Sequence, residues 1–187
     1  MFDQPTDAPA TLGAPYEGFA TIREVGPLGM IALRCAQDAP ALGPALRAAA
    51  GAGLPGQRRI AVTGARAVAW MSPDELLLML PVAEAAAALE GLSQALSGTH
   101  HLAVEVSDAR CVFRIEGAKA DQVLRKLCPA DLDRMAADEI RRTRAAQVAC
   151  AFWREGDGFT LVAFRSVAAY VRGILTNAAR PGSELSG

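Results

Sequence analysis

The chain has 187 residues, of which 51% are hydrophobic and 21% are charged. These values are typical of a folded globular protein and exclude wholesale disorder. Its formal net charge of −1 provides no long-range field that would attract nucleic acid or an acidic membrane surface. No apolar run approaches the roughly 20 residues of a membrane-spanning helix, and the first residues lack the features of a signal peptide. We therefore expect a cytoplasmic protein without nucleic-acid or membrane partners.

Both ends of the chain are predicted to be poorly ordered. Residues 1–18 are rich in Pro and Gly and offer little apolar surface to bury, and residues 180–187 have the same character. Between them, residues 19–179 show no low-complexity linker. We expect one domain made of two sub-layers, 19–98 and 99–179.

The first predicted elements are two short strands, at 19–25 and 30–35, and an Ala-rich helix at 41–50 that Gly and Pro residues end. A pattern of strand, tight turn, strand and helix then recurs three times. The first copy is predicted as three strands and a helix, at 59–62, 67–71, 76–80 and 82–96.

In the second copy, apolar side chains recur at every second position along two runs. Leu102, Val104 and Val106 share one face of a predicted strand, and Cys111 and Ile115 lie with Phe113 on one face of the next. We expect these two strands to form a hairpin, each covering one side of a core, with a helix at 118–127 after them.

The third copy is the most regular. Predicted strands at 145–153 and 159–164 flank a turn with two Gly residues, which hairpin turns favour. Ser166 is a suitable N-cap for the following helix, whose apolar residues recur at helical spacing. Hairpins that alternate with helices predict an α+β fold: antiparallel sheets with helices on one face, built from ferredoxin-like split βαβ units.

Few residues suggest chemistry. Adjacent strand residues point to opposite faces, so His100 and His101 make a poor metal chelate. The chain has no nucleophile elbow and no glycine-rich dinucleotide motif. We expect no catalytic, cofactor-binding or metal-binding residue in this chain.

The four cysteines, Cys35, Cys111, Cys128 and Cys150, contain no C-x-x-C pair. They are predicted to be free, buried thiols. Cys128 precedes a proline in a turn that reads as exposed, so it is the one thiol that we would test for reactivity.

Several larger side chains are open to two interpretations. Arg142 and Arg144 lie in an arginine run that either meets an anionic partner or is a solvated face. Trp70 and Trp153 lie on predicted strands, with core packing as the first interpretation and an interface anchor as the second. A weak ion pair across the turn between Asp108 and Arg110 is also expected.

Five stretches together resemble the gamma subunit family of heterotetrameric sarcosine oxidase, over roughly residues 20–179. They are Thr21–Arg34, Ala67–Pro81 (AVAWMSPDELLLMLP), Ser107–Leu132 (SDARCVFRIEGAKADQVLRKLCPADL), Arg142–Trp153 (RTRAAQVACAFW) and Gly158–Val171 (GFTLVAFRSVAAYV). They contain the side chains that we single out as candidate interface or family-motif residues, namely Trp70, Asp108, Arg110, Cys128, Arg142, Arg144, Trp153 and Arg165.

The resemblance implies a non-catalytic subunit for assembly. The implied complex oxidises sarcosine to glycine and hydrogen peroxide, and forms methylenetetrahydrofolate when tetrahydrofolate is present. FAD, FMN and NAD would lie in other subunits, and the alpha subunit would be the main partner beside beta and delta subunits. Self-association of the isolated chain is left open. The implied fold is distantly similar to the folate-binding fold of glycine-cleavage T proteins.

An alternative is a stand-alone folate-binding module or aminomethyltransferase-like enzyme, and another is a relative recruited to a different amine-oxidising complex. Folate-using relatives carry an acidic residue in the strand region that corresponds to 148–164. Here the only acids, Glu155 and Asp157, are predicted to lie in a turn. This departure argues against a catalytic carboxylate.

Overall fold

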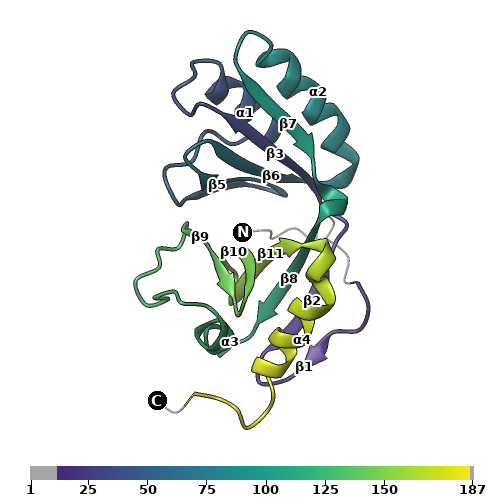
Figure 1. Ribbon diagram of the computed structural model, residues 1–187, viewed down its shortest axis with the longest axis vertical. Helices are drawn as coiled ribbons and strands as arrows, with labels where there is room; N and C mark the ends of the chain where they lie inside the picture. Colours follow the sequence, from purple (N-terminus) through teal and green to yellow (C-terminus); the bar gives the residue numbers. More distant parts are fainter. Residues whose placement is uncertain (1–11, 186–187) are drawn as a thin grey trace. The chain divides into compact units, whose positions relative to one another are not determined.

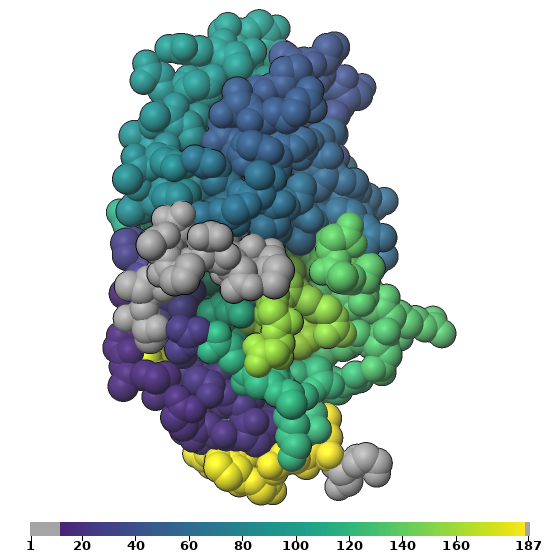
Figure 2. Space-filling model, turned by 180° about the vertical axis from the view of Figure 1, so that it is seen from behind, coloured from purple at the N-terminus to yellow at the C-terminus, as the bar shows by residue number. Residues whose placement is uncertain are grey.

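The computed structural model describes residues 12–185, which fold into two compact units. The first unit is Pro27–Ser107, and the second unit joins the described residues of Pro9–Gly26 to those of Asp108–Gly187. The second unit therefore contains both ends of the described chain, and its purple, green and yellow residues are seen in Figure 2.

The first unit is built on a five-stranded antiparallel sheet in the order β4-β5-β6-β3-β7. Figure 1 labels β5, β6, β3 and β7 of this sheet. Its strands are β3 (Gly29–Cys35), β4 (Ile60–Thr63), β5 (Arg66–Ser72), β6 (Glu75–Leu80) and β7 (His101–Glu105). Its helices are α1 (Leu42–Ala50) and α2 (Ala85–Ala95), the latter after the short η1 (Val82–Glu84).

Both helices of the first unit pack on the same face of its sheet. Leu46 of α1 and Leu92 of α2 share one hydrophobic cluster with Leu33, Leu76 and Leu78. All six residues of β6 are buried, in keeping with its continuous apolar run and its position inside the sheet.

The second unit has a six-stranded antiparallel sheet in the order β1-β2-β8-β11-β10-β9. Its strands are β1 (Tyr16–Glu17), β2 (Thr21–Val25), β8 (Arg110–Glu116), β9 (Ile140–Ala145), β10 (Val148–Glu155) and β11 (Gly158–Phe164). Its helices are α3 (Ala120–Leu127) and α4 (Ala168–Ala178), with the short η2 (Ser107–Ala109) and η3 (Arg165–Val167) before β8 and α4.

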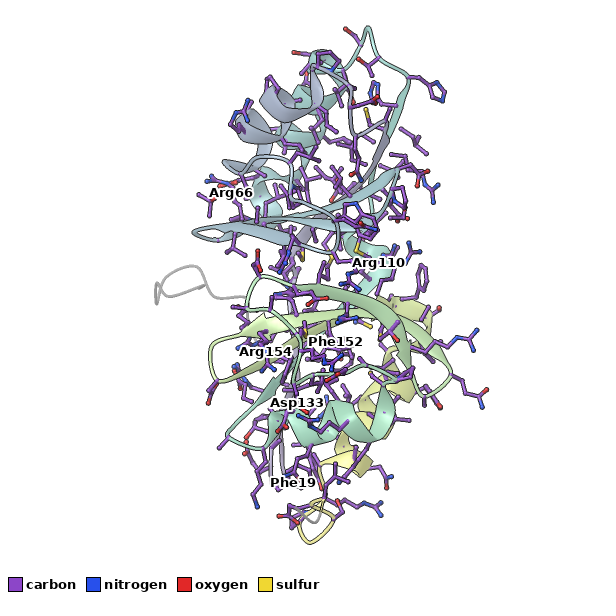
Figure 3. All side chains as sticks on the ribbon, turned by 90° about the vertical axis from the view of Figure 1, so that its left-hand side faces the viewer. Phe19, Arg66, Arg110, Asp133, Phe152 and Arg154 are labelled. Atoms are coloured by element: carbon purple, nitrogen blue, oxygen red, sulfur yellow. The ribbon has the colours of Figure 1, made fainter. Side chains whose placement is uncertain are left out.

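The core of the second unit lies between its sheet and its two helices. Phe152 packs edge-on against Phe159, with ring centroids 6.0 Å apart, and Figure 3 shows Phe152 inside this unit. A Cβ at Gly158 would lie 2.0 Å from the carbonyl oxygen of Ile115. Glycine at this position therefore lets β11 approach β8 closely.

The two units share one arrangement of strands. In the first unit, α1 links β3 to the β4–β5 hairpin, and β6 lies between β3 and β5. In the second unit, α3 links β8 to the β9–β10 hairpin, and β11 lies between β8 and β10. Both are split βαβ units of the ferredoxin-like kind. The predicted α+β class, with antiparallel sheets and helices on one face, is confirmed.

The structure differs from the sequence prediction in which strands pair and in which sheet each strand belongs to. The expected hairpin of the second copy does not form, because β7 pairs with β3 and β8 pairs with β2 and β11. The 3-10 turn η2 lies between β7 and β8, so the chain passes from one sheet to the other there. β2 belongs to the sheet of the second unit, although the sequence placed it in the sub-layer 19–98.

The predicted tails are only partly covered by the structure. Residues 1–11 and 186–187 lie outside the described residues. Tyr16–Glu17, within the predicted tail 1–18, pairs with β2 as the short strand β1. The Phe19 N–H, just beyond that tail, donates to the Ala179 carbonyl oxygen at 2.9 Å. The N-terminal segment is therefore anchored on both sides of Gly18.

Candidate functional site

A network of charged side chains crosses the sheet of the second unit. Arg114 and Glu116 of β8 alternate with the core residues Phe113 and Ile115, so they lie on the face away from the helices. Arg114 lies 2.6 Å from a carboxylate oxygen of Glu155 and 3.6 Å from one of Glu116. Four strands contribute to this network, which the sequence did not predict.

The network is closed at both ends by further hydrogen bonds. Arg114 donates to the Thr160 hydroxyl at 2.7 Å, and that hydroxyl donates to Glu155. Two guanidinium nitrogens of Arg23 in β2 donate to the carboxylate of Glu116, and one of these hydrogen bonds is 2.8 Å long. These hydrogen bonds hold the pKa of Glu116 below its ordinary value and raise the pKa of Arg23.

The position of Glu155 corrects the sequence prediction. Glu155 is the last residue of β10 rather than a turn residue, and its side chain is only 14% exposed. Its carboxylate is bound by Arg114 and Thr160. Both contacts are made by the same carboxylate oxygen, Oε2, and they tie the side chain into the charged network, so the geometry favours a structural ion pair over a general base.

A second cluster lies where β8 begins and β11 ends. The Arg110 guanidinium lies 4.2 Å from the centre of the Phe164 ring, whose side chain is 46% exposed. Arg165 of η3 forms an ion pair with Glu24 of β2. Asp108 is exposed in η2. Phe164 and Glu24 were not singled out from the sequence. All other residues of β11 are buried, so its sequence pattern gives no signal that Phe164 at its end is exposed.

The two tryptophans have different environments. Trp70 is half-buried on β5, packs on the core of the first unit and donates to the Gln37 side chain at 3.2 Å. Trp153 on β10 is buried, and its indole N–H meets no partner among the described residues. Burial makes Trp153 unsuitable as an accessible anchor within this chain.

All four cysteines are free and buried, as the sequence predicted. The expectation of an exposed Cys128 is wrong, because Cys128 ends α3 inside the core of the second unit. It shares a hydrogen bond with Cys150, and this bond together with burial raises the pKa of Cys150. A buried thiol of this kind is poorly placed for reaction with solutes.

The arginine run lies on β9, at one edge of the second sheet. Arg142 and Arg144 are exposed, and Arg141 forms a 2.8 Å ion pair with the buried Glu139. The run therefore differs along its length in exposure: Arg141 is partly buried beside Glu139, whereas Arg142 and Arg144 are exposed.

One groove lies on the helical side of the first unit. It has a volume of about 420 Å³ and lies between α1 and α2, with Ala and Gly residues along most of its wall. Arg66 and Glu84 form a two-pronged ion pair in it, at 2.7 and 2.8 Å, and Figure 3 labels Arg66. Arg47 also lines the groove.

Among residues 12–185, no group of three or more His, Cys, Asp and Glu side chains could hold a metal ion. His101 lies on β7 with its Nδ1 2.9 Å from the Thr99 carbonyl oxygen. None of the helices in the described part of the chain is long and apolar enough to cross a membrane.

Comparison with solved structures shows what this fold is similar to. A chain of the heterotetrameric sarcosine oxidase from Corynebacterium sp. U-96, solved in complex with pyrrole 2-carboxylate, matches with a TM-score of 0.77 and 30% identity. The match covers 90% of this chain and 87% of that chain. Aminomethyltransferase T of the glycine cleavage system from Bartonella henselae matches with a TM-score of 0.61 at 16% identity, over 84% of this chain and 45% of the other, which shows a shared fold.

Sequence comparisons agree with the structural match. The sarcosine oxidase subunit gamma of an Arthrobacter species is 36% identical over 145 residues, covering 75% of this chain and 70% of the relative. The subunit gamma of Corynebacterium sp. strain U-96 is 36% identical over 146 residues, covering 75% and 69%. The model of the sarcosine oxidase, gamma subunit family matches residues 34–180. The chain belongs to the sarcosine oxidase gamma subunit family.

Proposed function

We propose that this chain is an accessory subunit of a heterotetrameric sarcosine oxidase and that it catalyses no step itself. The observation that carries the proposal is the likeness, over 90% of the chain, to a chain of such an assembly. The paired carboxylates of the second unit support the non-catalytic part. Glu116 and Glu155 are bound by arginines, and a general base needs a carboxylate free to accept a proton.

In this proposal the assembled enzyme demethylates sarcosine to glycine, with hydrogen peroxide and methylenetetrahydrofolate as the other products. FAD, FMN, NAD and tetrahydrofolate are held by other subunits, with the alpha subunit as the main partner of this chain and beta and delta subunits completing the complex in the cytoplasm. Family membership supports this assignment.

The test is co-expression of the alpha, beta and delta subunits with and without this chain. We expect a complex whose mass includes one copy of each subunit and which forms peroxide when sarcosine is added. Omission of this chain should reduce the recovery of the complex, and the isolated chain should show no peroxide formation. An equally active three-subunit particle that excludes the chain would refute the proposal.

A folate titration of the isolated chain covers the alternative of a stand-alone folate-binding module. The shared fold with an aminomethyltransferase is the reason to include it. We expect no saturable binding of tetrahydrofolate at micromolar concentrations. Saturable binding that Arg114→Leu abolishes would instead assign a ligand to the charged network.

A further inference from the structure

The strand β7 forms one edge of the first sheet and has backbone groups that face outward. The Val106 N–H donates to the Met30 carbonyl oxygen at 2.8 Å, so hydrogen-bonded pairs with β3 fall at Val106, Val104 and Leu102. The N–H and C=O groups of the alternate residues point away from β3. These residues are His101, Ala103 and Glu105. No backbone bond to their outward groups occurs among residues 12–185.

The same strand exposes two large apolar side chains. Leu102 is 55% exposed and Val104 is 42% exposed, on the face of the sheet away from α1 and α2. The sequence alternation correctly places Leu102 and Val104 on one face of the strand. In the structure, however, that face is exposed and does not cover a core. An apolar, unpaired strand edge is a hazard that proteins ordinarily remove.

The other edges of the two sheets are protected. β1 has two residues and β4 has four, which leaves little to pair with. β9 has six residues but carries the exposed Arg142 and Arg144. β7 has five residues in continuous register with β3, and the three at its centre are Leu102, Ala103 and Val104. Among the described edge strands, β7 is therefore the one that is neither as short as β1 and β4 nor charged at its centre like β9.

The second unit provides an internal comparison. β2 occupies the place in its sheet that β7 occupies in the first, next to the strand that starts the split βαβ unit. On its outer side, β2 is paired with β1. The equivalent position beside β7 has no strand from the described part of this chain.

We propose that an extended segment of another subunit of the assembly adds to β7 as a further strand. This inference rests on the proposed function and names the surface through which the chain docks. The added strand would receive backbone hydrogen bonds from β7 and place apolar side chains against Leu102 and Val104. The neighbouring Arg34 is already paired with Asp74 and Glu75, so the added strand needs no acidic residue there.

A second copy of this chain fits the same edge less well. Stable dimers bury at least about 1,200 Å² in total, and a five-residue strand with two apolar side chains is a small fraction of that area. A subunit of a heterotetramer can bury the remaining area elsewhere. A short strand that fixes register is therefore sufficient for it.

The test compares three variants of the chain within the co-expressed four-subunit complex. Leu102→Lys/Val104→Lys places charge on the apolar face. Ala103→Pro removes one outward N–H but keeps the ladder to β3, because that N–H does not point to β3. Val82→Lys is the matched control, since Val82 is 47% exposed but lies in η1. Circular dichroism and thermal unfolding establish that each isolated variant is folded.

We expect Val82→Lys to be retained in the complex like the unmodified chain. The other two variants should be retained at least about tenfold less, since both the backbone pairing and the apolar face are required. Unchanged retention of both β7 variants would overturn the edge assignment and leave the proposed function intact. If the unmodified chain itself is not retained in the complex, both the edge assignment and the proposed function are wrong. If the β7 variants change only the mass of the isolated chain, from dimer to monomer, the edge pairs two copies and the proposal is wrong.

Discussion

The two units of this protein have the same strand arrangement but differ in the charges on the faces away from their helices. Both faces bury apolar side chains, which are Ala67, Ala69, Leu77 and Met79 in the first unit and Val112, Ala151, Trp153 and Val162 in the second. In the second unit the face also carries the linked ion pairs of Arg23, Arg114, Glu116 and Glu155. In the first unit it carries only the ion pairs of Arg34 with Asp74 and Glu75 among those described here. One fold can therefore hold charged networks of different extent at the same place, and the fold alone does not identify a site.

The units also differ in the strand that lies beside β3 in the first unit and beside β8 in the second. In the second unit this place is filled by β2, which is covered by β1. In the first unit it is filled by β7, which is left open on its outer side among the described residues. We infer that stability depends on charge pairing mainly in the second unit, and that docking depends mainly on the first.

The largest effects should come from the two cores. Phe152→Ala and Leu78→Ala each remove a fully buried side chain and should each lower the free energy of unfolding by about 3–5 kcal/mol. Each unit contains one tryptophan, Trp70 in the first and Trp153 in the second. Denaturation of variants with a single tryptophan therefore follows each unit separately. If Leu78→Ala shifted the Trp153 transition as much as the Trp70 transition, the units would unfold together.

The next effect should come from the charged network. Arg114→Leu leaves Glu155 and Glu116 without their shared cation, although their side chains are only 14% and 24% exposed. We expect a loss of about 2–3 kcal/mol, measured by urea denaturation. Adding Glu155→Gln should recover part of it. Arg66→Ala in the first unit is the matched control, because the Arg66–Glu84 pair is more exposed and should matter less. Equal losses for both arginines would contradict a special role for the network.

The network should also give the second unit a dependence on pH. The pKa of Glu116 is held below its ordinary value of 4.5 by the hydrogen bonds from Arg23. Its contribution to stability is therefore present above the unfolded pKa and is lost as the pH falls through the folded pKa. Unfolding measured from about pH 6 to about pH 3 should lose more stability in the unmodified chain than in Glu116→Gln. Parallel curves would show that the pair contributes nothing.

The smallest effect should come from a solvent-exposed cluster of the second unit. Arg125 bonds to Asp121 at 2.9 Å and to Asp133 at 2.5 Å, and Figure 3 labels Asp133. Such pairs contribute little, because water and salt screen them. Arg125→Ala should change the melting temperature by no more than about 2 °C in scanning calorimetry. A much larger change would mean that the arginine also positions the loop that follows α3.

Local patterns in the sequence predicted most elements of the fold. The Gly-containing turn between β10 and β11, the continuous apolar run of β6 and the helical stripe of α4 are all found in the structure. Strand partners could not be predicted in the same way, because β2 and β8 are more than 80 residues apart in the sequence, and pairing at that distance leaves no local signal. The alternation in β7 fixed which residues share a face, but not whether that face points inward.

The candidate sites differ in how far the sequence could indicate them. Arg110, Arg142, Arg144 and Arg165 were singled out from the sequence as candidate interface residues, because long charged side chains beside strands are conspicuous, and that role stays a prediction. The network around Arg114 was missed, since its members come from four strands that only the tertiary fold brings together. Cys128 was misplaced for a related reason: the Cys-Pro pattern resembles an exposed turn, whereas the side chain enters the core beside Cys150.

The path of the chain through the two units has a consequence for protein synthesis. The first unit, Pro27–Ser107, leaves the ribosome as one continuous segment and can fold as soon as it has emerged. β2 is translated earlier, yet its partner β8 follows the whole of that segment. The nascent chain therefore carries β2, with β1 before it, without its partner β8 until the later residues appear. A fragment that starts at Asp108 would lack this strand altogether and leave the side of β8 exposed, so expression of the second unit by itself requires residues 12–26 to be supplied with it.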